Sequence, residues 1–126
     1  MKDLSRKYLS KAARAIGAAE LLLGQGDVES AASRAYYAMV YTVHALLTGK
    51  ELTFRKHAGV HSAFGEHFVK TGQFDASFHR WLLEAFSQRL QADYGIEIQL
   101  DSDDVLDMID HAKRFLQRAE DYSQGA

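Results

Sequence analysis

The chain contains neither cysteine nor proline in its 126 residues. The absence of cysteine excludes disulfides, thiolate metal sites and a cysteine nucleophile. The absence of proline means that no helix is interrupted by a ring clash. No apolar run approaches the roughly 20 residues of a membrane helix, and residues 1–7 are too charged to resemble a signal peptide. We therefore expect a soluble, cytoplasmic protein with no membrane partner.

Charge is nearly balanced overall but differs between two parts of the chain. Residues 1–96 carry 12 Lys and Arg against 9 Asp and Glu, whereas residues 97–126 carry 3 against 8. Solvated helix faces are the ordinary explanation of both the basic excess in residues 1–96 and the acidic excess in residues 97–126. Neither part is basic enough to indicate tight, salt-driven binding of long nucleic acid, so any RNA contact is expected to be local.

The spacing of apolar residues predicts an all-α fold. A chain of this length fits one domain, residues 1–126, since domains commonly have roughly 100–150 residues. Glycines stand where helices would stop, at positions 24, 26, 49, 72 and 95. Between these stops the apolar residues recur every three or four positions, which is typical of amphipathic helices. The sequence therefore predicts an antiparallel bundle of four to five helices.

Four of the predicted helices carry a clear apolar stripe, and the third covers residues 57–70. Asp27 and Asp75 are expected to cap the second and fourth helices. The acidic run 101–104 suits the start of the last helix. Residues 95–100 are interpreted as an extended connector, since a lone strand over residues 96–100 would have no partner. The stripes comprise Leu4, Tyr8, Ala12, Ala15, Ala19 and Leu22; Val28, Ala31, Ala35, Met39, Thr42 and Leu46; Phe78, Leu82, Phe86 and Leu90; and Val105, Met108, Ile109, Ala112, Phe115 and Leu116.

Polar and aromatic residues share one face of the second predicted helix. Arg34, Tyr37, Tyr41 and His44 stand at i, i+3, i+7 and i+10, away from the alanine-rich stripe. Such a face can form one wall of a binding cleft. The alternative is that Tyr36, Tyr37 and Tyr41 are half-buried core residues whose hydroxyls bond to neighbouring helices.

A second candidate group ends the fourth predicted helix. Arg89 and Asp93 are four residues apart, and Tyr94 follows. In a functional interpretation Asp93 orients the guanidinium of Arg89, whose planar fork matches a phosphate. In the structural alternative the two form an exposed ion pair that contributes roughly 0.3–0.5 kcal/mol.

Histidines form a third candidate group. His57 and His61 stand at i and i+4, a spacing that suits a metal ligand pair, but nearby residues offer no third ligand in register. His57 also suits a helix cap or a packing position. Because phosphate-binding loops and zinc or serine-hydrolase motifs are absent from the sequence as well, we expect no metal and no cofactor.

These segments resemble the HEPN family, in particular its short single-domain branch. The matching segments span the central two thirds of the chain, in the family's order. They are Ala32-Ser33-Arg34-Ala35-Tyr36-Tyr37-Ala38-Met39, Lys56-His57-Ala58-Gly59-Val60-His61, Phe64, Phe68-Val69-Lys70-Thr71-Gly72 and Arg89-Leu90-Gln91-Ala92-Asp93-Tyr94.

The resemblance implies a helical bundle that forms a homodimer and, in many relatives, is the toxin partner of a minimal nucleotidyltransferase. Catalytic relatives are metal-independent RNases in which an Arg holds phosphate and a His four to six residues later does acid–base work. Here Arg89 is followed by Asp93 and Tyr94 instead, so catalysis is left open. His44 or His57 would have to replace that histidine. In some relatives the transferase adds AMP to a nearby tyrosine, which would make Tyr94 a substrate.

The sequence thus supports two functions. The first is an RNA- or nucleotide-directed toxin-type protein with Arg89, Asp93, Tyr94 and His44 as catalytic candidates. Its ligand-binding candidates are Arg34, Tyr37, Tyr41 and His57. The second is a non-catalytic dimeric module that binds a nucleotide or a protein.

Overall fold

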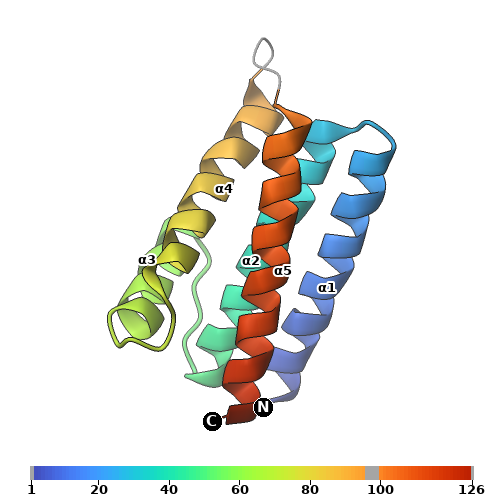
Figure 1. Ribbon diagram of the computed structural model, residues 1–126. Coiled ribbons are helices and arrows are strands. Elements are labelled where there is room, and N and C mark those ends of the chain that lie inside the picture. Colours follow the sequence, from blue (N-terminus) through green and yellow to red (C-terminus); the bar gives the residue numbers. More distant parts are fainter. Residues whose placement is uncertain (1, 96–99, 126) are drawn as a thin grey trace.

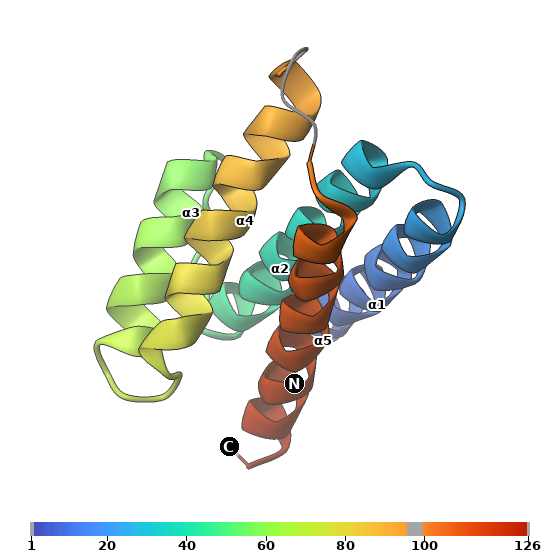
Figure 2. The same ribbon diagram turned by 45° about the horizontal axis from the view of Figure 1, so that its top comes forward.

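The computed structural model describes residues 2–95 and 100–125, and every element in this part of the chain is helical. Helices α1 and α2 run antiparallel, as do α4 and α5, while α3 packs beside α4 (Figures 1 and 2). These features confirm the all-α class and the helical bundle. The elements are α1 (Asp3–Gly24), α2 (Val28–Gly49), α3 (His57–Phe64), the π-helical turn η1 (Gly65–Val69), α4 (Ala76–Tyr94) and α5 (Ser102–Gly125).

Helix α2 is the centre of the bundle. It packs against α1, α3, α4 and α5, and lies behind α5 in Figure 1. The predicted stripe is buried from Ala31 through Leu46, and buried residues also occur on other sides of the helix. Its alanines let neighbouring backbones approach closely, because a methyl group is the smallest side chain with a Cβ. Residues that project from α2 therefore meet side chains of several other helices.

The predicted helix boundaries agree with the structure at most ends. Asp27 Oδ1 accepts a hydrogen bond from the backbone N–H of Ser30, and Asp75 Oδ2 accepts one from Ser77. Helices α1 and α2 end at the predicted glycines, 24 and 49. At the start of α5, Asp101 Oδ1 accepts a hydrogen bond from the N–H of Asp103. The expected connector, and its strand alternative, fall mostly on residues 96–99, which lie outside the described residues.

The third predicted helix changes its hydrogen bonding midway. Helix α3 ends at Phe64 and continues as η1, in which the N–H of Lys70 donates to the carbonyl of Gly65 over 2.9 Å. Gly65 lies against α4, and a Cβ at this position would be only 3.0 Å from Cε1 of His79. Glycine at this position therefore permits the close approach of α4.

Two of the predicted stripe residues face solvent instead of the core. Leu4 is 51% exposed, and its neighbour Ser5 is buried, with Oγ donating to the carbonyl of Ala45. Leu90 is also exposed, whereas Arg89 lies one turn beyond the buried Ala85. A helix has 3.6 residues per turn, so a stripe of four-residue steps drifts around the helix axis. On α4 this drift turns Leu90 outward and Arg89 toward α2.

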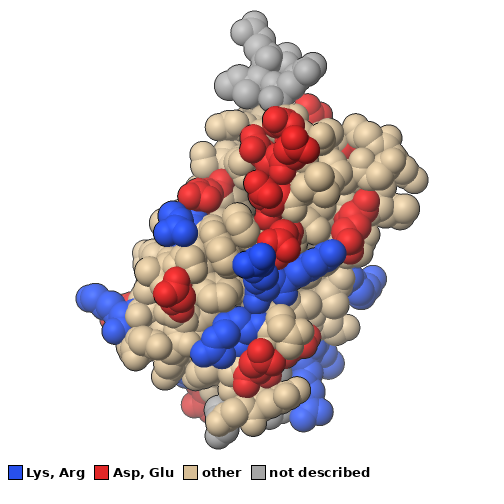
Figure 3. Space-filling view, viewed as in Figure 1, with Lys and Arg blue, Asp and Glu red and all other residues tan. Residues whose placement is uncertain are grey.

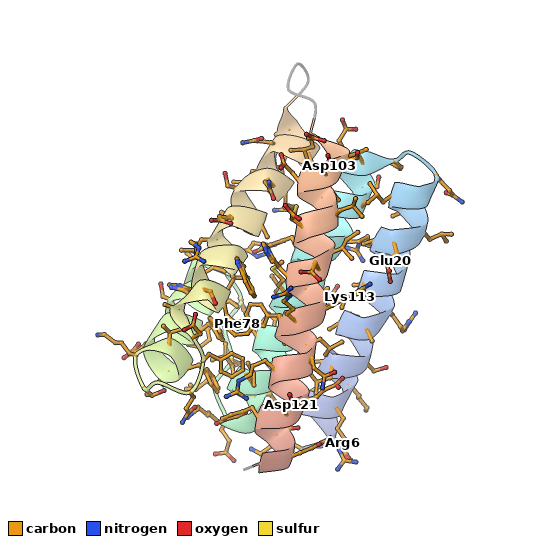
Figure 4. All side chains as sticks on the ribbon, viewed as in Figure 1. Arg6, Glu20, Phe78, Asp103, Lys113 and Asp121 are labelled. Atoms are coloured by element: carbon orange, nitrogen blue, oxygen red, sulfur yellow. The ribbon has the colours of Figure 1, made fainter. Side chains whose placement is uncertain are left out.

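Aromatic side chains fill the space between η1, α4 and α5. Phe78 projects from α4 toward α5 (Figure 4), and its ring centre lies 5.2 Å from that of the buried Phe115. Phe74 packs edge-on against Phe64 at 5.4 Å. Edge-to-face pairs of this kind add roughly 0.5–1.5 kcal/mol to the contribution of burial. This cluster anchors the end of the bundle opposite the α1–α2 turn.

Within the described residues, no helix combines the length and apolar character needed to cross a membrane.

Candidate functional site: an arginine, tyrosine and histidine cluster

Arg89 reaches from α4 to the aromatic side chains of α2. Its Nη2 donates a 3.1 Å hydrogen bond to the hydroxyl of Tyr37. The guanidinium carbon lies 5.3 Å from the centre of the Tyr37 ring and 6.0 Å from that of Tyr36. A cation near an aromatic ring is attracted to it, and the attraction grows as water is removed. Helix α2 therefore fixes the position of the Arg89 head group.

Asp93 links Arg89 to a second residue of α2. Its Oδ2 lies 2.8 Å from Arg89 Nε. The buried Nε atom makes no hydrogen bond within the described residues. Its contact with the Asp93 carboxylate is therefore an ion pair and not a hydrogen bond. The other oxygen, Oδ1, accepts a 2.8 Å hydrogen bond from Ser33 Oγ. The pair forms as predicted, but the expectation that it is exposed is wrong for Arg89, whose side chain is only 14% exposed.

Tyr36 holds two histidines of α3. Its hydroxyl lies 2.8 Å from His57 Nδ1 and 2.9 Å from His61 Nε2. Phe86 of α4 covers both imidazoles, with ring centres 5.7 Å from His57 and 5.0 Å from His61. Tyr36 and His61 are buried, whereas His57 is only partly buried. Of the two imidazoles, His57 is therefore the one that a ligand can reach.

The single hydroxyl proton limits how this network is protonated. A tyrosine hydroxyl donates one hydrogen bond, so it donates to one imidazole nitrogen and accepts an N–H from the other. Either Tyr36 donates to His57 and accepts from His61, or the reverse. In both arrangements one imidazole has an unprotonated nitrogen, so the two histidines are not both positively charged.

Burial and neighbouring charges favour the neutral forms of this cluster. Burial, followed by the positive charge of Arg89, lowers the pKa of His57. Burial, followed by the charges of His57 and His79, lowers the pKa of His61 to about 4. Burial also raises the pKa of Tyr36 well above its usual range. At neutral pH both imidazoles are therefore neutral, and His57 can accept a proton.

The polar face predicted on α2 is continuous over its first three members. The guanidinium carbon of Arg34 lies 5.2 Å from the centre of the Tyr37 ring, and the ring centres of Tyr37 and Tyr41 are 6.1 Å apart. His44 instead stacks on Tyr8 of α1, with ring centres 5.2 Å apart and planes inclined by 17°. His44 therefore belongs to the α1–α2 seam, while the imidazole beside Arg89 is that of His57.

The remaining sequence candidate, Tyr94, directly follows Asp93 but is largely exposed. It is the last residue of α4 and is 73% exposed. The structure adds Ser33, Tyr36, His61 and Phe86, which were not chosen as site residues. Ser33 stands four residues before Tyr37, and this spacing was a usable signal, whereas Tyr36 is adjacent to Tyr37 and so points to another side of the helix. Nothing in the local sequence of α4 indicates that Phe86 covers two histidines.

A surface cavity opens beside the Asp93 end of the cluster. Its volume is about 570 Å³, and Ser33, Arg34 and Asp93 contribute to its wall. Ser33 and Arg34 stand one turn before Tyr37 on α2, so the cavity lies beside the part of α2 that binds Arg89. Within residues 2–95 and 100–125, no group of three His, Asp or Glu side chains is arranged to hold a metal ion. The cluster itself contains a guanidinium, a carboxylate, two imidazoles and two tyrosine hydroxyls.

Known proteins resemble this chain along most of its length. The family model described as "HEPN domain" matches residues 5–122. A UPF0332 protein of Thermotoga maritima is 40% identical over 81% of this chain and 77% of its own. A Methanocaldococcus jannaschii protein named "Putative toxin MJ0142" is 33% identical over 92% of this chain and 79% of its own. A UPF0332 protein of Gloeobacter violaceus is 30% identical over 97% of this chain and 98% of its own.

Proposed function

This chain belongs to the HEPN family, and we propose that it is a toxin-type member that acts on RNA through Arg89 and His57. The name of the Methanocaldococcus jannaschii relative supports the toxin-type role. The observation that carries the proposal is the meeting of Arg89 and His57 around two tyrosines of α2. Arg89 bonds to the Tyr37 hydroxyl, and the His57 ring centre lies 6.1 Å from that of Tyr37.

In this proposal Arg89 binds the phosphate and His57 is the acid–base residue. A guanidinium stabilises the negative charge that builds up on a phosphate during cleavage. An imidazole that is neutral at pH 7 can take a proton from the attacking hydroxyl. When Tyr36 accepts a hydrogen bond from His57 Nδ1, the other ring nitrogen, Nε2, is left to accept that proton. His57 thus replaces the histidine that catalytic relatives carry shortly after the arginine.

The proposal includes a homodimer and a minimal nucleotidyltransferase as partner. The proposal also places the RNA target, and therefore the action of the protein, in the cytoplasm. Tyr94 presents its hydroxyl at the end of α4 and is 73% exposed, which suits an acceptor for AMP from the partner. Modification there would place a phosphate next to Asp93 and close to the cavity that Ser33 and Arg34 line. Such a group would hinder the approach of RNA by charge repulsion and by its size.

Expression in a bacterial host tests the toxin-type role. Induction of the wild-type chain is expected to arrest growth, while Arg89→Ala and His57→Ala are expected to relieve the arrest. Arg80→Ala is the matched control, because Arg80 also stands on α4 with a carboxylate four residues later but is 63% exposed. Normal growth with the wild-type chain at a confirmed protein level would refute the toxin-type role.

The structure also supports a rival, in which the protein is a non-catalytic dimeric binding module. The observation in its favour is the burial of Arg89 behind Asp93, which suits a structural role for that arginine. Purified protein that binds a labelled RNA without shortening it would support the rival. Cleavage that disappears in His57→Ala would support the catalytic proposal.

A further inference from the structure

A second hollow lies between α1 and α2, on the same side of α2 as Tyr37. We call it the α1–α2 groove. It has a volume of about 210 Å³ and is lined by Lys11, Arg14, Ala15, Ala18, Arg34 and Tyr41. Three of these six residues are cations, and none is acidic.

The three cations of the groove have no acidic partner within the part of the chain that the structure describes. Within the described residues, no carboxylate lies within ion-pair distance of Lys11, Arg14 or Arg34. By contrast, Lys113 on the neighbouring α5 pairs with Glu20 of α1 at 2.9 Å (Figure 4). Like charges that converge without a counter-charge repel one another. An anionic ligand would remove this repulsion.

Aromatic rings lie between the cations. Lys11 Nζ is 5.0 Å from the centre of the half-buried Tyr41 ring, and Arg34 lies over Tyr37. Alternating cations and aromatic faces are the pattern with which proteins hold single-stranded nucleic acid. The cations follow the backbone, and each ring offers a stacking surface for a base.

The groove is continuous with the Arg89 cluster. Tyr41 packs against Tyr37, whose hydroxyl binds Arg89. Arg34 lines both the α1–α2 groove and the cavity beside Asp93. A strand that crosses Arg34 would therefore pass from one hollow to the other alongside Arg89.

We propose that the α1–α2 groove binds the phosphate backbone of single-stranded RNA while another phosphate of the same strand lies at Arg89. The inference rests on the RNA-directed function proposed above and extends it to the substrate class. The substrate is a strand of several nucleotides, not a free nucleotide. Lys11, Arg14 and Arg34 bind phosphates, and Tyr41 stacks on a base.

The opposite charge distribution on α5 agrees with this placement. Acidic side chains gather over the first half of α5 in Figure 3, and Asp103 and Asp104 stand in its first turn. That surface repels a phosphate backbone. An acidic protein segment is the competing occupant of the groove, but it would not need the aromatic face of Tyr41.

The test measures binding of an unstructured RNA of about twelve nucleotides, within the range that single-strand binding sites cover, by fluorescence anisotropy. Affinity is measured from about 50 to about 200 mM salt, where each neutralised phosphate contributes about 0.7 to the slope of log K against log salt concentration. The binding variants Lys11→Gln and Arg14→Gln are each expected to reduce the slope by that amount. Lys70→Gln is the matched control, since Lys70 is exposed beyond η1, an element that makes no contact with α1.

Tyr41 separates stacking from simple charge attraction. Tyr41→Phe keeps the ring and is expected to bind normally, whereas Tyr41→Leu is expected to weaken binding about tenfold. Both variants are checked by thermal melting, because Tyr41 is half-buried. An unchanged melting temperature with weaker binding supports the proposal. Equal binding of folded Tyr41→Leu and Tyr41→Phe counts against the stacking role.

The outcomes separate the groove from the function on which it depends. RNA binding by the wild-type chain with an unchanged slope in Lys11→Gln and Arg14→Gln would overturn the groove but not the RNA-directed function. A slope that falls equally in Lys70→Gln would also overturn the groove. Binding of a mononucleotide as tightly as the strand would overturn the substrate class. Failure of the wild-type chain to bind RNA at all would overturn both proposals.

Discussion

Ser33 of α2 donates a 2.8 Å hydrogen bond to Oδ1 of Asp93 on α4, across 60 positions of sequence. The same two helices are joined one turn away by the hydrogen bond from Arg89 to Tyr37. On each helix the two residues stand at i and i+4, so the pairs face each other in register. Asp93 and Arg89 are in turn an ion pair. The four side chains therefore connect α2 and α4 and hold the arginine head group.

Tyr36→Phe is expected to destabilise the fold by about 2 kcal/mol, because the loss of one partner leaves a buried polar group unsatisfied at a cost of roughly 1–3 kcal/mol. The change removes the hydrogen bonds to His57 and to the buried His61. Urea unfolding measures the difference. The control is Tyr122→Phe, whose lost hydroxyl makes no hydrogen bond within the described residues. Equal effects of the two changes would contradict the role given to the Tyr36 hydroxyl.

Arg89→Lys is expected to weaken RNA binding about tenfold or more, since a charge-assisted hydrogen bond contributes roughly 1.5–3 kcal/mol. Lysine keeps the charge but lacks the planar fork. Because Arg89 is largely buried, Arg89→Ala is also expected to cost about 2 kcal/mol of stability, less than the several kcal/mol of a fully buried pair. Thermal melts and RNA binding are measured on the same samples. Lost stability with unchanged binding would show that Arg89 is only a structural residue.

Stability is expected to fall as the pH drops from about 6.5 to about 4 through the titration of His61. The folded protein keeps His61 neutral in this window while the unfolded chain takes up a proton, so acid favours unfolding. A shift of this size corresponds to about 3 kcal/mol, at 1.36 kcal/mol per unit. Urea unfolding across this pH range provides the measurement. His61→Gln should lose less stability over the same range, and an identical pH dependence would refute the assignment.

The protein is expected to be a homodimer with two-fold symmetry, as the family resemblance implies. Helix α4 exposes three large apolar or aromatic residues that offer surface for such contact, namely Leu83, Leu90 and Tyr94. Light scattering at micromolar concentration should return twice the chain mass of 14.1 kDa. A mass of one chain over that concentration range would rule out the dimer.

The helices of this fold were predictable because their signals are local. Capping by Asp27 and Asp75 depends on a side chain and an N–H two or three residues away, and both caps form. The stripe of α5 is buried from Val105 through Phe115, as its spacing predicts. The π-helical turn η1 was not predictable in this way. It occurs beside Gly65, where His79 of another helix approaches.

The candidate site was predictable only in part. Sequence spacing identified Arg89 with Asp93 and the face of α2 that carries Arg34, Tyr37 and Tyr41. It ranked His44 among the catalytic candidates, whereas His44 stacks on Tyr8 and His57 lies beside Tyr37. Which histidine meets an arginine on another helix depends on how the helices pack, and periodicity carries no information about that.

The amino-acid sequence by itself determined that the chain forms a bundle of four to five helices, where most of these helices end, and the family to which the chain belongs. Hydrogen-bond caps, glycine stops and apolar repeats act within a few residues, so they can be recognised without a partner helix. Only the tertiary structure decided that Arg89 faces the bundle while Leu90 faces solvent, and that one tyrosine hydroxyl binds both His57 and His61. These relationships depend on the rotation and crossing of helices, which are set by packing over the whole core.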